Sequence, residues 1–103
     1  MGINIAGFEC VYTAKVTSVS TTSQAIQIPD AYVIASASTV VVNDTDQTIF
    51  VKKGRTSPTA TETGEGISVI LAGQAAVIGK AEGFVAVYAL SAATGTVYVT
   101  VGN

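Results

Sequence analysis

The chain has 103 residues, which is the usual size of one domain, so a single domain over residues 1–103 is expected. Only 12% of the residues are charged, 49% are hydrophobic and the net charge is −2. Five basic residues are too few for the many phosphate contacts of nucleic-acid binding, and so little charge predicts an apolar surface that neighbouring molecules can cover.

The N-terminal segment MGINIAGFEC, residues 1–10, precedes the first predicted strand. It lacks the basic and continuous apolar stretches of a secretory signal, so synthesis in a cytoplasm is expected. We interpret the segment as an arm that reaches a neighbour through Ile3, Ile5 and Phe8, because such a segment can become ordered on binding. A frayed terminus is the alternative interpretation.

Alternation of apolar and polar residues, rich in Val, Ile, Thr and Tyr, predicts strands rather than helices along the whole chain. In the last strand, Val97, Val99 and Val101 are expected to point inward. The connections are too short for crossover helices, so the sheets should be antiparallel. We predict an all-β fold, an antiparallel two-sheet β-sandwich that is jelly-roll-like, with a small closed barrel as the second choice. About eight short strands are expected, at residues 11–19, 24–28, 32–42, 48–53, 67–71, 75–79, 84–90 and 96–101.

The stretch VVVNDTDQTIFV, residues 40–51, places two aspartates between two apolar runs. A calcium loop of the EF-hand type starting at Asp44 would need Gly at position 49 and Glu at position 55, where the chain has Ile49 and Arg55. We therefore interpret residues 43–46 as the corner of a hairpin. A weak calcium site through Asp44 and Asp46 is the alternative.

Residues 54–66, GRTSPTATETGEG, form the longest irregular stretch and predict an exposed loop with a short edge strand at 59–63. Arg55, Pro58, Glu62 and Glu65 are its candidate contacts with a partner, and an idle loop is the alternative.

The segment FVAVYAL, residues 84–90, is apolar on both faces and needs cover on both. Either a neighbouring subunit, through residues such as Tyr88, or a loop of the same chain can supply the second cover. Residues 83–103 carry no charge and approach the length of a membrane span, but Thr94-Gly95 interrupts them. We interpret them as a hairpin and expect no membrane partner.

The chain has no His, which removes the commonest general base and the most frequent zinc ligand. Glu62 and Glu65 could pair as in a glycosidase, but a flexible loop holds two carboxylates poorly. The segment GQAAVIGKA, residues 73–81, has five residues between its glycines and Ala81 in place of the hydroxyl that a phosphate-binding loop needs. We predict no catalytic, cofactor-binding or metal-binding residues, no cofactor, and no enzymatic activity.

The order of features in residues 38–103 is similar to that of a known class of proteins. A strand ending in V-x-N, a polar turn, I-F-V-x-x-G, a Thr/Gly-rich loop and a terminal T-G-T-V-Y-V-T-V strand follow one another. This order resembles the capsid decoration, or cement, proteins of tailed bacteriophages.

The resemblance implies a β-sandwich or jelly roll that assembles as a dimer or trimer and binds the major capsid protein. It implies a non-enzymatic bacteriophage protein, made in the host cytoplasm and located on the virion surface, which decorates and stabilises the capsid. A tail or fibre-base component is one alternative, and a carbohydrate-binding β-sandwich module for host attachment is another.

Overall fold

The structure is a computed structural model that describes residues 8–103. Ile3 and Ile5 lie outside the described residues. Eight strands and one short helix follow one another along the described part of the chain: β1 Cys10–Thr17, β2 Gln24–Gln27, α1 Asp30–Ile34, β3 Ser38–Thr45, β4 Ile49–Gly54, β5 Ser68–Ile70, β6 Ala75–Gly79, β7 Phe84–Ala89 and β8 Gly95–Gly102.

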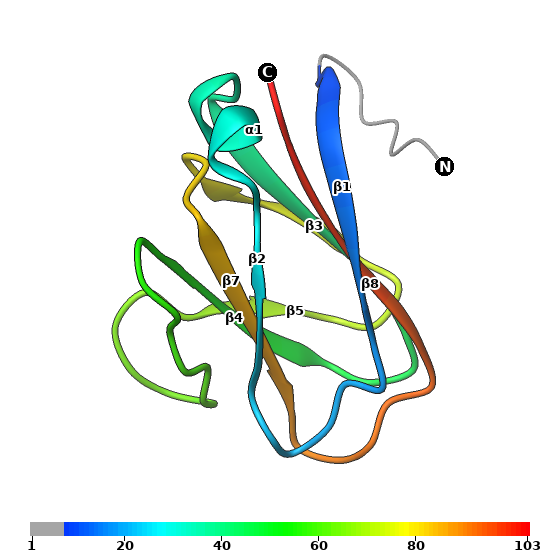
Figure 1. Cartoon of the computed structure of the whole chain (residues 1–103). Helices are drawn as coiled ribbons and strands as arrows, with labels where there is room; N and C mark the ends of the chain where they lie inside the picture. The colour runs from blue at the N-terminus through cyan, green and yellow to red at the C-terminus, as the bar shows by residue number, and fades with distance from the viewer. Residues whose placement is uncertain (1–7) are drawn as a thin grey trace.

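The strands form two antiparallel sheets of four, which face each other in Figure 1. Sheet A has the order β1-β8-β3-β6 and sheet B the order β2-β7-β4-β5. Successive strands change sheet at every connection except the one between β4 and β5. This alternation, with the first and last strands side by side in sheet A, is the strand order of a jelly roll. The predicted all-β, two-sheet sandwich is confirmed.

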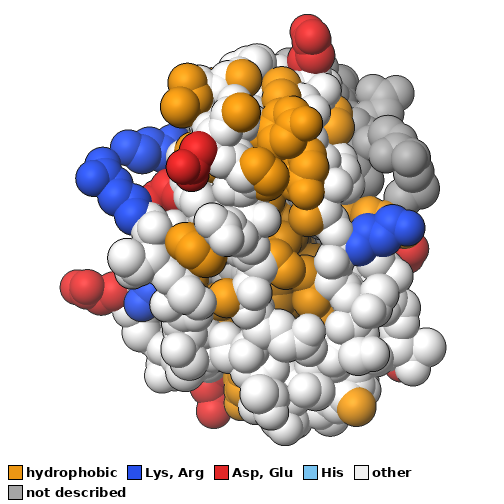
Figure 2. Space-filling model, viewed as in Figure 1, with side chains coloured by type: hydrophobic (Ala, Val, Ile, Leu, Met, Phe, Trp, Pro, Cys, Tyr) orange, Lys and Arg blue, Asp and Glu red, His pale blue; other side chains and the backbone are white. Residues whose placement is uncertain are grey.

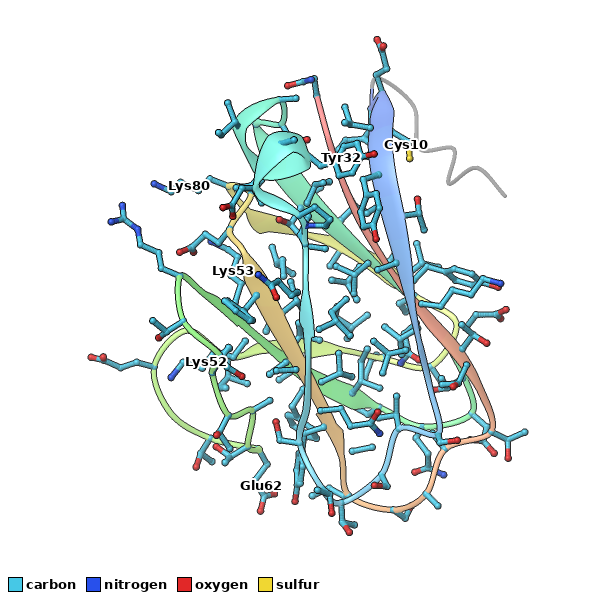
Figure 3. All side chains as sticks on the ribbon, in the orientation of Figure 1. Cys10, Tyr32, Lys52, Lys53, Glu62 and Lys80 are labelled. Carbon is cyan, nitrogen blue, oxygen red and sulfur yellow. The ribbon has the colours of Figure 1, made fainter. Side chains whose placement is uncertain are left out.

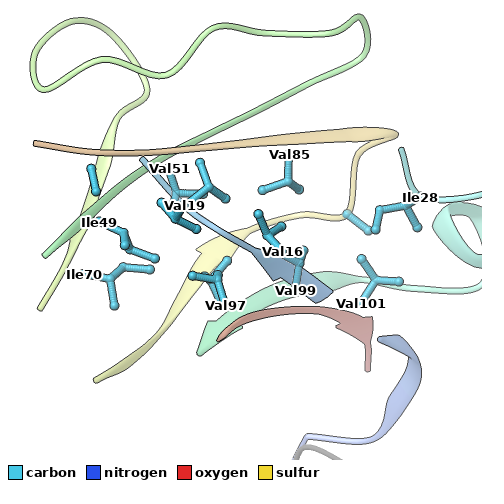
Figure 4. Packing of buried hydrophobic residues seen from close by; sticks show 14 residues of the cluster. Val16, Val19, Ile28, Ile49, Val51, Ile70, Val85, Val97, Val99 and Val101 are labelled. Carbon is cyan, nitrogen blue, oxygen red and sulfur yellow. The ribbon is translucent and has the colours of Figure 1, made fainter. Parts of the chain in front are cut away.

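The core lies between the sheets and is built almost wholly from branched aliphatic side chains (Figure 4). The expected inward direction of Val97, Val99 and Val101 is confirmed, since all three are buried in this core. Each such side chain stabilises the fold by about 1.5–3 kcal/mol when it leaves water. The other central members are Val16 and Val41 from sheet A, and Ile49, Val51, Ile70, Val85 and Val87 from sheet B.

The strand predicted at 32–42 is wrong over its first half, because α1 occupies Asp30–Ile34 and β3 begins only at Ser38. The N–H groups of Tyr32 and Val33 both donate to the carbonyl of Pro29, at 2.9 and 3.2 Å, and so close one helical turn. Pro29 is the N-cap of α1, with a φ of −57° and a ψ of 139°, the extended backbone that an N-cap residue usually has. The apolar residues of AYVI resemble a strand, but this local geometry decides the outcome.

Both predicted hairpins are also wrong. The strands on either side of residues 43–46 are β3 in sheet A and β4 in sheet B, and β7 and β8 likewise belong to different sheets. Residues 43–45 continue β3 instead of forming a turn. Period-two alternation specifies a strand and its two faces, but the partner strand is chosen by long-range packing.

Candidate interaction surfaces

The outer face of sheet B is covered by the loop of residues 55–66. Figure 4 shows this loop on the side of β4 and β7 opposite the core. Ala60, in the loop, is 1% exposed, and its N–H donates to Ser23 Oγ at 2.9 Å. Phe50 and Ala86 project from the same outer face and are buried as well. The second apolar face of β7 is therefore covered by a loop of the same chain.

Tyr88 lies on this covered face but stays half-buried, with its ring 6.0 Å from that of Phe50. Pro58 is half-buried near Gly54, while Glu62 and Glu65 are exposed. The structure forms no strand at 59–63. Arg55 lines a pocket together with Lys80, and Figure 3 shows Glu62 at the opposite end of the molecule from Lys80. The candidate contact residues of this loop thus do not converge on one spot.

The end of the N-terminal segment belongs to sheet A. Glu9 and Asn103 exchange two backbone hydrogen bonds, of 2.6 and 2.9 Å, and Cys10 already lies in β1. Phe8 is half-buried, and its ring lies so close to Gly102 that a Cβ there would stand 2.9 Å from Phe8 Cζ. Phe8 therefore contacts its own sheet.

The residues of the Asn43–Asp46 stretch have three separate roles. Asn43 is fully buried between the sheets, and its amide donates to the carbonyls of Gln47 and Ile70 at 2.8 and 3.0 Å. Asp46 accepts a 2.8 Å hydrogen bond from the N–H of Thr94. Asp44 is exposed and lies opposite Thr96 in the ladder with β8. Within residues 8–103, no three His, Cys, Asp or Glu residues gather as a metal site would need.

A polar pocket of about 320 Å³ lies beside α1 and was not predicted from the sequence. Its charged lining residues are Asp30, Arg55, Lys80 and Glu82. Glu82 is paired with Lys53 at 3.0 Å, and the remaining charged lining residues are the cations Arg55 and Lys80 and the single carboxylate of Asp30. This set can bind a small polar ligand that carries a carboxylate or several hydroxyl groups.

At one side of the sandwich, β5 and β6 are the edge strands of the two sheets. Three large apolar side chains are exposed here: Val69 at 56%, Leu71 at 59% and Val77 at 62%. The sequence from residue 66 to residue 79 has no charged side chain. We call β5, β6 and the turn between them the open edge.

At the opposite side, β1 and β2 are the edge strands, and hydrophobic side chains line the gap between them (Figure 2). Tyr32, on α1, is 40% exposed and stacks on Tyr12 of β1, with ring centroids 4.6 Å apart. The core is thus partly open to solvent along this side. We call the half-exposed residues here the apolar stripe: Tyr12, Ala14, Ile26, Tyr32 and Val33.

No protein-family model, curated protein or solved structure matches this chain. Within residues 8–103, no helix has the length and apolar character that crossing a membrane requires.

Proposed function

We propose that the protein is a non-enzymatic structural component of a bacteriophage virion, which binds the outside of the capsid as a homo-oligomer and stabilises the shell. The observation that supports this best is the pair of apolar surfaces at opposite sides of one jelly roll, the open edge and the apolar stripe. A decoration protein needs two such surfaces, one for its own copies and one for the major capsid protein.

The low charge of the chain supports the same function. Burying a surface is costly when ions must leave water, and only 12% of these residues are charged. The outer face of sheet B is covered by the 55–66 loop, so among the apolar surfaces described above the two edges remain for partners. We assign the open edge to self-association and the apolar stripe to the shell. Weak single contacts then reinforce one another when many copies bind one particle.

Co-sedimentation with capsids tests the proposal. The capsids are empty particles of the virus whose genome encodes this chain, and they are prepared so that they lack this protein. We expect the wild-type protein to pellet with the particles. Tyr32→Ala should lower the bound fraction at least about tenfold, because it removes the most exposed ring of the apolar stripe. Tyr98→Ala is the matched control, since Tyr98 lies in β8 outside the stripe. Wild-type protein that never pellets would contradict the proposal.

A tail or fibre-base component would use the same two surfaces. Pelleting with purified tails in place of capsids would identify that role.

A carbohydrate-binding module for host attachment is the second candidate, and one arrangement favours it. Helix α1 carries both the exposed ring of Tyr32 and Asp30, which lines the polar pocket. Sugar sites commonly combine an aromatic ring with carboxylates. A glycan array that gave one tight ligand, with binding lost in Asp30→Asn, would place this function above capsid binding.

A further inference from the structure

The outer side of β6 offers backbone groups to a partner strand. At the start of β6, the N–H of Gly73 donates to the carbonyl of Asn43, and the N–H of Asn43 donates to the carbonyl of Gln74, both at 2.8 Å. Gly73 has a φ of +75°, so these two bonds form a bulge that fixes the phase of the β3–β6 ladder. In an antiparallel pair the backbone groups alternate in direction from this point on.

The register then determines which backbone N–H and C=O groups of β6 point away from β3. Val41 lies two residues before Asn43 in β3, so the N–H and C=O of Val41 point toward β6, as those of Asn43 do. Ala76 lies opposite Val41, so the N–H and C=O of Ala76 point toward β3. Ala75 and Val77 lie on either side of Ala76, so their N–H and C=O groups point away from β3. The regular ladder ends at the register shift between Thr39 and Val40. Two residues therefore present free donors and acceptors in a row.

Neither Lys nor Pro lies within β6 itself, and the nearest Lys, Lys80, follows its last residue. Native edge strands are commonly blocked by Lys, by Pro or by a covering loop. Residues 67–79 contain neither Lys nor Pro, and within residues 8–103 no strand pairs with the outer side of β6. By contrast, β1 at the opposite edge of sheet A carries exposed Lys15 within the strand. An open-ended chain of copies, β6 on β1, is therefore disfavoured.

We propose that β6 pairs with β6 of a second copy of this chain about a two-fold axis, so that the two four-stranded sheets A join into one continuous antiparallel sheet. Ala75 of one copy lies opposite Val77 of the other, which places the axis at Ala76 and forms about four N–H···O bonds. The occupant is a second copy because this pattern of outward groups is complementary to itself, as a two-fold interface requires. This inference rests on the homo-oligomeric part of the proposed function.

The size of the contact sets its strength. Five strand residues span roughly 17 Å, so the contact falls short of the roughly 800 Å² per partner that stable complexes bury. We therefore expect a weak dimer in free solution, with a Kd on the order of 10–100 µM. On a particle, the high local concentration of copies would favour the paired form.

Sedimentation velocity of the full chain from about 1 µM to 1 mM tests the interface across the concentrations at which this Kd predicts dimerisation. We expect a reversible monomer–dimer equilibrium for the wild type. Val77→Lys, at an exposed site, should raise the Kd at least about tenfold by placing two like charges on either side of the axis. Ile34→Lys on α1 is the matched control, because Ile34 is more exposed than Val77 and lies away from the open edge. Wild-type protein that stays monomeric at 1 mM would overturn the inference.

Ala75→Pro tests the backbone directly. It removes an N–H that the β3–β6 ladder does not use, so the monomer should keep its circular dichroism spectrum while the dimer is lost. If the chain forms a dimer that neither Val77→Lys nor Ala75→Pro weakens, another surface holds it and the inference is wrong.

A cysteine at the axis tests the register. Ala76→Cys in a Cys10→Ser background should form an intermolecular disulfide on mild oxidation, since residues facing each other across the axis lie within disulfide range. Ala75→Cys in the same background should cross-link more slowly, because its partner is Val77. Equal rates would exclude the proposed register. Capsid binding by Val77→Lys protein separates the two proposals, since binding without dimerisation would leave the proposed function standing.

Discussion

Replacing Asn43 by Ala should be one of the most destabilising single substitutions in β3. The Asn43 side chain is 0% exposed and makes four hydrogen bonds. Its amide nitrogen donates to the carbonyls of Gln47 and Ile70, and its oxygen accepts from the N–H and the hydroxyl of Thr45 at 3.1 and 2.6 Å. The side chain thereby links β3 of sheet A to β5 of sheet B.

The magnitude follows from the partners that Ala would leave behind. The carbonyl of Gln47 would keep one hydrogen bond, because the Thr45 hydroxyl also donates to it at 3.1 Å. The N–H of Thr45 and the carbonyl of Ile70 lose the Asn43 bond in a buried setting, at about 1–3 kcal/mol for each group left unsatisfied. We expect a total loss of about 3–4 kcal/mol. A domain of this length has an unfolding free energy of about 5–15 kcal/mol, so the loss is a large share.

Equilibrium unfolding in urea measures the free energy of unfolding, and an unchanged m-value would show that the same two-state transition is compared. Asp44→Ala is the matched control, since Asp44 is the next residue along β3 but is exposed. It should change the free energy of unfolding by less than about 0.5 kcal/mol. A loss below about 1 kcal/mol for Asn43→Ala would refute the reasoning that this amide joins the two sheets.

Three further changes test other contacts. Gly95 has a φ of +115°, and a Cβ there would clash with the backbone oxygen of Asp44. Gly95→Ala should therefore lower the free energy of unfolding by more than about 2 kcal/mol. Gly83→Ala is the control and should not cause this loss, because a Cβ at Gly83 would meet open space. Ser23→Ala removes the hydroxyl that holds Ala60, so limited proteolysis within residues 61–66 should become several-fold faster than in the Ser91→Ala control; unchanged cleavage would show that the loop is held in another way. Lys53→Met breaks the 3.0 Å ion pair with Glu82, in which both side chains are 20% exposed. Urea unfolding should show that the free energy of unfolding falls by less than about 1 kcal/mol. A larger fall would mean that Lys53 makes stabilising contacts besides this pair.

The strands were predictable because their signal is local. The strand predicted at 75–79 has the observed bounds of β6, and those predicted at 24–28 and 84–90 differ from β2 and β7 by one residue. Alternation along these segments reflects burial on one face or both, which neighbouring residues alone can show. The helix at Asp30–Ile34 escaped prediction because one turn held by the Pro29 carbonyl contains too few residues to show a helical period.

The interaction surfaces were only partly predictable, because they depend on which strands become neighbours. The uncharged stretch 66–79 is visible in the sequence, but its place at the edge of both sheets follows from the topology. The cover over sheet B depends on a hydrogen bond between Ser23 and Ala60, which are 37 residues apart. The polar pocket likewise joins α1, the end of β4 and the β6–β7 connection. No local sequence pattern predicts such contacts between segments that are far apart in the chain.

The two apolar edges together determine how the proposed dimer would act on a particle. The sheet orders place the apolar stripe and the open edge at opposite sides of each sandwich. Pairing through β6 would therefore leave one stripe at each far end of an eight-strand sheet, with the two β1 strands roughly 34 Å apart. Such a dimer can bridge two sites on a shell. Val77→Lys should then weaken particle binding only through lost avidity, and a covalent link between two copies should restore it. Tyr32→Ala should weaken each contact with the shell, leave the dimer intact, and resist rescue by the same link. If both variants lost dimerisation and binding together, the two edges would not act as separate surfaces.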